Sequence, residues 1–267
     1  MIASLAMYDQ PWLKAANDRL WHAIAVSLRD QGVPDVPDRL GRSIDLEDAW
    51  LSPRLLLGQT CGYPLMSQLR ESVQLVATPH YRAEGCDGAR HRSAIIVRTD
   101  DRAAGLPDLR GRTAGVNSFT SNSGMNLFRA AIAPHANARP FFGRVILTGS
   151  HARSYAGVLS GRIDVAAIDA VTLAHLRRRY PRRAEAIRVI AWTEPSPGLP
   201  LITASATSSE TLAALRSALA SVSQDPALSD TLATLLIGGF ETLSLDDYEA
   251  VLALEQASIA QHYPALA

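Results

Sequence analysis

The chain has 267 residues, of which 47% are apolar and 19% charged, and its 26 Lys and Arg residues balance its 26 Asp and Glu residues. This composition excludes a disordered chain, and the absence of a basic excess argues against a nucleic-acid-binding protein. The length suits two lobes of about 100–150 residues each. The one dense basic run, at residues 177–183, is typical of a solvated helix end.

No stretch approaches the ~20 consecutive apolar residues that a membrane-spanning helix needs, so we expect no membrane insertion. The N-terminus shows neither a basic region nor the long apolar region of an export signal. The sequence as given therefore predicts a cytoplasmic protein, or a periplasmic one if it is a mature form.

The two cysteines, Cys61 and Cys86, leave two alternatives open. They could pair in an exported protein, or remain free thiols in a reducing compartment. Their spacing matches no zinc pattern, and we expect neither a metal nor a cofactor.

The spacing of apolar residues predicts the elements of the first part of the chain. In order they are a strand at 2–7, a helix at 12–30, a strand at 55–57, a helix at 62–70, a strand at 73–77, a loop at 79–90 and a strand at 93–97.

The middle of the chain alternates more regularly. Strands at 113–117, 144–148, 164–168 and 186–192 are separated by helices at about 124–133, 151–160 and 170–179. A segment at 194–200 with three prolines predicts an extended crossing, followed by a strand at 201–204 and helices at about 212–222, 227–236 and 246–262.

Strands that alternate with helices indicate an α/β protein with mostly parallel sheets flanked by helices. Two chain crossings, near residues 97 and 193, would separate the middle section from both ends. The sequence therefore predicts a discontinuous first lobe, residues 1–97 plus 193–267, and an inserted second lobe, residues 98–192, which carries anion-binding helix N-termini.

Ligands of open α/β sheets bind beyond the carboxyl ends of the strands. The first such junction holds Ser118, Ser121, Asn122 and Ser123, just before a predicted helix. The free N–H groups of a helix N-terminus, together with hydroxyls, predict an anion site there. The alternative is that one of these serines only caps the helix.

Two further junctions place His151 and Asp169 at predicted helix starts. Either residue could face a ligand, and either could serve the helix alone, Asp169 as an N-cap. In the first lobe, Tyr8, Gln59 and Thr60 follow predicted strands, and Trp192 ends another. We count all four among the candidate ligand-binding residues, although an aromatic at a strand end is most often part of the core.

Four ordered motifs resemble the phosphonate-binding family of ABC importer components. They are Asp108–Arg112, Asn117–Ser118 with Ser121–Gly124, Thr148–His151, and Gly161–Asp169. The resemblance implies a two-lobed type 2 periplasmic-binding-protein fold, with a ligand cleft between lobes that close about a hinge.

The resemblance also implies roles for individual residues. The residues at Ser121, Asn122 and Ser123 would grip a phosphonate together with His151, Asp169 would face a ligand amine, and Tyr8 would cover the site. This chain has Asn122 where a hydroxyl residue is common in the family.

We therefore expect a monomeric solute-binding protein for a small anionic ligand, serving an ABC-type membrane subunit or a sensing partner. The alternative is a cytosolic enzyme on the same fold, such as a chorismate-dehydratase-like lyase, with His151 or Asp169 as its titratable base. The sequence shows no nucleophile elbow, P-loop or metal-ligand set that would favour an enzyme.

Overall fold

The structure is a computed structural model that describes residues 1–267. The chain forms two compact units. The first unit comprises Met1–Arg82, Asp87–Ala89 and Gly198–Asp247, and the second comprises Ala83–Cys86, Arg90–Pro197 and Tyr248–Ala267. These bounds differ from the boundaries expected near residues 97 and 193, because strand β6 (Ser93–Arg98) and residues 248–267 belong to the second unit.

The first unit is built on a five-stranded sheet with the order β1-β2-β12-β3-β13. Its strands are β1 (Ile2–Ser4), β2 (Leu55–Gln59), β12 (Leu201–Ala204), β3 (Val73–Tyr81) and β13 (Ile237–Glu241). Only β1 and β2 pair in parallel, and the other three pairings are antiparallel. The expectation of a mostly parallel sheet is corrected here, since β12 and β13 enter it from the later part of the chain.

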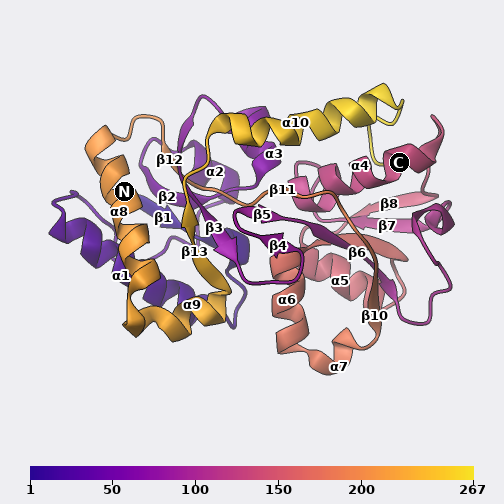
Figure 1. Ribbon diagram of the computed structural model, residues 1–267, viewed down its shortest axis with the longest axis horizontal. Helices are drawn as coiled ribbons and strands as arrows, with labels where there is room; N and C mark the ends of the chain where they lie inside the picture. The colour runs from indigo at the N-terminus through magenta and orange to yellow at the C-terminus, as the bar shows by residue number, and fades with distance from the viewer. The chain divides into compact units, whose positions relative to one another are not determined.

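Helices α1 (Lys14–Asp30), α8 (Ser209–Gln224) and α9 (Ser229–Leu235) lie together in this unit (Figure 1). Leu20, Ile24 and Leu28 of α1 recur at helical spacing and are buried with Leu215 and Leu219 of α8. The unit also holds the short helices η1 (Ala6–Tyr8), α2 (Leu46–Leu51), α3 (Gly62–Pro64), η2 (Leu65–Leu69) and η5 (Pro226–Leu228).

Some predicted elements of the first unit differ from the observed ones. The strand expected at 2–7 ends at Ser4 and passes into η1, and β3 continues through Pro79 to Tyr81, where a loop was expected. Strand β13 was missed altogether. Its two glycines give it a low strand propensity, and it forms because its backbone pairs with β3.

The second unit contains a five-stranded sheet with the order β10-β6-β9-β7-β8. Besides β6 (Ser93–Arg98), its strands are β10 (Ile187–Trp192), β9 (Val165–Asp169), β7 (Thr113–Val116) and β8 (Arg144–Leu147). The pairs β7–β8 and β7–β9 are parallel, whereas β6 is antiparallel to both of its neighbours. This sheet too is mixed, since it contains both parallel and antiparallel pairs. The helices that join β7, β8 and β9 are the crossover connections that parallel pairs require.

Helices cover both faces of this sheet. Helix α4 (Leu127–Ala136) lies on one face, and α5 (His151–Leu159) and α6 (Ala170–Arg179) lie on the other (Figure 1). The remaining elements are η3 (Leu106–Leu109), η4 (Asn122–Asn126), α7 (Pro181–Ala184), α10 (Leu245–Ala260) and the short strands β4 (Cys86–Asp87), β5 (Arg90–His91) and β11 (Ser196–Pro197).

No helix combines the length and the hydrophobicity that crossing a bilayer requires.

Both cysteines are free thiols in the structure. Cys61 is buried, and burial together with the charge of Asp169 raises the pKa of Cys86 to about 12. A thiol with so high a pKa is almost entirely protonated at neutral pH and is a poor nucleophile.

Arg129 links α4 to the C-terminal segment of the second unit. It is 3% exposed, and its guanidinium donates to Pro264 O at 2.8 Å and to Asn126 Oδ1 at 2.7 Å, with Glu255 Oε1 at 3.3 Å. A buried cation is tolerated only when it is paired and hydrogen-bonded, as it is here.

We predict that Arg129→Met lowers the free energy of unfolding by about 2–4 kcal/mol, because it leaves buried acceptors without a donor. The exposed Arg144 on β8 supplies the control, and Arg144→Met is expected to change the free energy by less than about 0.5 kcal/mol. Urea denaturation of both variants measures the difference. Equal midpoints would show that the Arg129 contacts contribute nothing to stability.

Helix α6 buries a second ionisable group, His175, which is 3% exposed and whose Nε2 has no hydrogen-bond partner. Burial and the nearby Arg178 lower the pKa of His175 to about 4, against the opposing effect of Asp169. His175 therefore binds a proton less readily in the folded state than in the unfolded state. Above the ordinary histidine pKa of about 6.5 this difference costs no stability, and the free energy of unfolding falls as the pH drops from there toward 4.

We predict that His175→Leu makes the ligand-free protein less sensitive to acid. Between pH 7 and pH 5 the wild type should lose about 2 kcal/mol more than the variant does. Unfolding free energies at the two pH values measure this, with His22→Leu on the exposed side of α1 as the control. A variant that loses as much stability as the wild type would contradict the prediction.

Candidate functional site

Polar side chains meet at one edge of the sheet in the second unit. The parallel strands β7, β8 and β9 end there, and the antiparallel strand β6 begins there, since Ser93 pairs with Asp169 and Val116 with Leu147. We call this the polar edge, and it carries Ser93, Asn117, Ser118, Thr148 and Asp169.

The chain after β7 turns into the η4–α4 helix, whose first turn has π geometry where an ordinary helical start was expected. Ser121 caps it, because its Oγ accepts the N–H of Gly124 at 3.0 Å. A Cβ at Gly124 would lie 1.8 Å from Asn117 Oδ1 and 2.9 Å from His151 Cε1, so only glycine lets the helix start approach both side chains.

Asn122 stands where the family that the sequence resembles commonly has a hydroxyl residue, and its amide makes hydrogen bonds to two neighbours. Its Nδ2 donates to Ser196 Oγ at 2.8 Å, while its Oδ1 accepts from Asn126 Nδ2 at 3.0 Å. Asn126 in turn donates to the carbonyl of Val251 at 2.9 Å. The side chain of Asn122 thus holds the helix start in place. The backbone N–H of Asn122 is one of the donors at the helix N-terminus.

His151 is the first residue of α5, and Ser150 caps this helix, because its Oγ accepts the N–H of Arg153 at 3.2 Å. The His151 Nε2 lies 2.9 Å from Ser123 Oγ, and the backbone of Ala167 forms a further hydrogen bond with the ring. Burial lowers the pKa of His151, and Asp169 opposes this shift only in part. At neutral pH the ring is therefore neutral and can act as a hydrogen-bonding group.

Asp169 ends β9 and is 2% exposed. Its Oδ1 accepts the N–H of Thr172 at 2.8 Å, so it caps α6, and its Oδ2 lies 3.0 Å from His91 Nδ1. Burial acts to raise the pKa of Asp169, but the hydrogen bond and charge of His91 outweigh it and hold the pKa at about 2. This carboxylate is ionised and already engaged by the protein.

The other predicted residues of this unit are Ser118 and Trp192. Ser118 is half-buried, and its Oγ lies 2.8 Å from Thr120 Oγ1. The ring of Trp192 packs so closely over Gly85 that a Cβ there would lie 2.4 Å from it. Trp192 is half-buried, and its contact with a ligand remains a prediction.

The three predicted residues of the first unit lie near one another in the sheet region. Gln59 Nε2 donates to Tyr81 Oη at 3.1 Å and to the carbonyl of Leu199 at 3.2 Å, and the rings of Tyr8 and Tyr81 meet edge to face at 5.2 Å. Thr60 is fully buried, and its Oγ1 has no partner.

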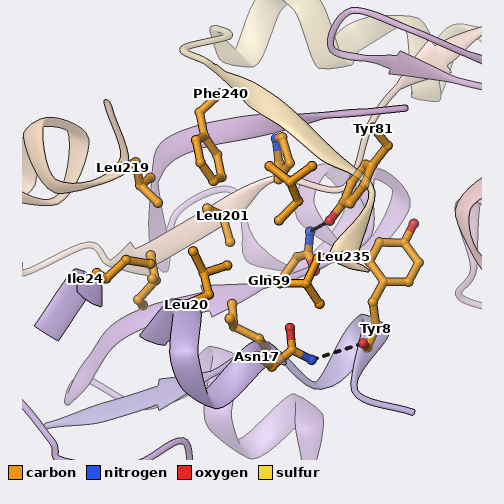
Figure 2. Close-up of a pocket in the computed structure, with 14 residues that line it drawn as sticks. Tyr8, Asn17, Leu20, Ile24, Gln59, Tyr81, Leu201, Leu219, Leu235 and Phe240 are labelled. Atoms are coloured by element: carbon orange, nitrogen blue, oxygen red, sulfur yellow. Dashed lines mark hydrogen bonds between the residues drawn. The ribbon is translucent and has the colours of Figure 1, made fainter. Parts of the chain in front are cut away.

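Tyr8 and Gln59 also line a cavity of about 30 Å³ in the first unit. Figure 2 shows Tyr8, Gln59 and Tyr81 on one side of it and Ile24 and Leu219 on the other. A space of this size holds about one water molecule, so the cavity is too small to hold an organic solute.

Sequence reasoning missed His91 and Ser196, which lie beside the predicted residues of the second unit. Ser196 falls in the proline-rich crossing and His91 beside an expected loop. Neither position carries a periodic pattern, and only the pairing of β5 with β11, with His91 opposite Ser196, brings them to the site.

Residues 55–248 match the phosphonate-binding family, described as the periplasmic substrate-binding protein of phosphonate ABC transporters. No curated protein matches the chain significantly.

Several solved structures share the fold. A binding protein component of an ABC phosphonate transporter from Pseudomonas aeruginosa is 19% identical, with a TM-score of 0.78 over 97% of this chain and 86% of that one. A Prochlorococcus marinus protein in complex with methylphosphonate is 16% identical, with a TM-score of 0.72 over 96% and 97%. A Xanthomonas citri protein bound to chloride ion is 18% identical, with a TM-score of 0.73 over 97% of both chains.

These neighbours confirm the expected α/β fold of two-lobed periplasmic binding proteins. The matching family is a transporter component that binds a solute, which does not favour the dehydratase-like alternative. The chain belongs to the phosphonate-binding family of periplasmic substrate-binding proteins of ABC transporters, and it is a solute-binding protein rather than an enzyme.

Proposed function

We propose that the protein binds a phosphonate or a related small oxyanion at the polar edge of the second unit. The observation that carries the proposal is the start of the η4–α4 helix, where Ser121, Asn122 and Ser123 cluster beside His151. A helix N-terminus offers N–H donors without partners and favours negative charge.

The donors suit an oxyanion better than a halide or a cation. Ser121 and Ser123 supply hydroxyls whose oxygens lie 3.5 Å apart, and the neutral ring of His151 already contacts one of them. Several directional donors around one point match the several oxygens of a phosphonate or phosphate group. The methylphosphonate bound by the Prochlorococcus marinus protein belongs to this class.

Ser118 is proposed to add a further hydroxyl at the polar edge. For Trp192, and for Tyr8, Gln59 and Thr60 of the first unit, a role in ligand binding stays a proposal that rests on the sequence pattern. The family works with the membrane subunits of ABC transporters, and we propose that this chain delivers its ligand to such a subunit as a periplasmic protein.

We predict that methylphosphonate, inorganic phosphate or both raise the melting temperature of the protein. A ligand that binds only the native state stabilises it by about 2.7 kcal/mol at a hundred times its Kd. Thermal shift and calorimetric titration measure the effect, with sulfate, acetate and chorismate as comparison ligands. The bound compound should be recovered unchanged, and a chemically altered product would contradict a purely binding role.

We further predict that Ser123→Ala weakens binding of the best oxyanion about 10- to 100-fold, because each hydrogen bond to a charged group contributes about 1.5–3 kcal/mol. The unfolding free energy should change by less than about 1 kcal/mol. Titration calorimetry of the variant measures the affinity.

Ser208 provides a matched control, since its Oγ caps α8 by accepting the N–H of Thr211 at 3.2 Å in the first unit. Ser208→Ala should lose about 1 kcal/mol of stability and keep its affinity. If Ser123→Ala kept wild-type affinity, Ser123 would have no place in the site.

A further inference from the structure

His91 holds a buried position beside the candidate site, and the family motifs give it no role. It lies in β5 opposite Ser196 of β11, whose Oγ accepts the Asn122 side chain, and it is 3% exposed. Burial is the main cause of the lowered pKa of His151, and the charge of His91 lowers it further. This electrostatic effect indicates that the two rings are near each other. His91 is thus part of the same polar cluster as the helix start.

The hydrogen bond between His91 and Asp169 fixes the tautomer of the histidine. Because the Asp169 carboxylate is ionised, with a pKa of about 2, it can only accept hydrogen bonds. The His91 Nδ1 at 3.0 Å from Oδ2 therefore carries a hydrogen and donates it. The His91 Nε2 is left buried and without a protein partner.

This pairing changes what Asp169 can do. A buried carboxylate without a partner would attract a cationic ligand group strongly, since few other charges or waters would compensate it. Asp169 instead has one oxygen on the Thr172 N–H and the other on His91. A ligand ammonium would have to share the carboxylate oxygens with these two donors, and this competition costs binding free energy.

We infer that His91 is a specificity-determining residue, which by binding Asp169 makes the site select oxyanions that carry no ammonium group. The inference rests on the proposed oxyanion site and names its substrate class: alkylphosphonates and similar anions are accepted, and aminoalkylphosphonates are rejected. The family resemblance implies that Asp169 faces a ligand amine, and this inference gives Asp169 a different role, as the partner of His91.

The test compares two ligands that differ only in an amine, ethylphosphonate and 2-aminoethylphosphonate, by titration calorimetry on the full chain. The wild type should bind ethylphosphonate at least about 10-fold more tightly. In His91→Ala the Asp169 carboxylate becomes available, and the preference should shift toward the amine by at least about 10-fold. Adding Asp169→Asn, which keeps an oxygen for the Thr172 N–H, should abolish that shift.

His80 supplies a matched control, because its Nε2 contacts Glu241 Oε2 at 3.0 Å in the first unit. His80→Ala should leave the ratio of the two affinities unchanged. If His91→Ala does not fold, His91→Asn, which keeps a donor toward Asp169 but removes the ring, is expected to show a smaller shift in the same direction.

The outcomes separate this inference from the proposed function. If the wild type prefers the amine, or if the ratio stays unchanged in both His91 variants while both ligands still bind, the inference is overturned and the oxyanion site stands. If the wild type binds no phosphonate, phosphate or sulfate at all, the proposed function fails and the inference fails with it.

Discussion

The hydrogen bonds of Asn122 are the constraint on which the site in the second unit depends. One end of its amide reaches Ser196 on β11, and the other reaches Asn126 one turn along the helix. Asn126 continues the connection to the Val251 carbonyl and to Arg129. A hydroxyl side chain is too short to make both contacts, so asparagine at this position joins three separate segments of the chain.

That connection places the backbone N–H groups of the helix start where strand β7 ends. Gly124 permits the close approach of Asn117 and His151, and Ser123 contacts the ring of His151. Preorganised donors cost little reorganisation when an anion arrives. The rigidity of the helix start therefore favours affinity for an oxyanion as well as stability of the unit.

The charges of the second unit are balanced within its polar cluster. Asp169 is ionised and paired with His91, while His151 and His175 have lowered pKa values and are neutral at neutral pH. The buried cation of Arg129, which donates to Asn126 Oδ1, is paired with Glu255. Selectivity would then be decided by hydrogen bonds and by the pairing of Asp169, which are local properties of the site.

Much of the fold was predicted from the sequence, because apolar spacing reports local structure directly. Helix α1 and the run of strands and helices from β7 to α6 follow such spacing, and their observed bounds are close to the expected ones. The junctions that hold Ser121, Ser123, His151 and Asp169 follow from this alternation, since polar residues after a parallel strand meet at one edge of the sheet.

The tertiary structure alone decided the strand directions, the extent of β3 and β13, and the partners of the site residues. Long-range backbone pairing sets strand direction, and the two glycines of β13 give no local strand signal. The pairing of His91 with Asp169 joins residues 78 positions apart. A lone histidine beside a loop has no sequence pattern that reveals its partner, because contacts between distant segments depend on packing rather than on local periodicity.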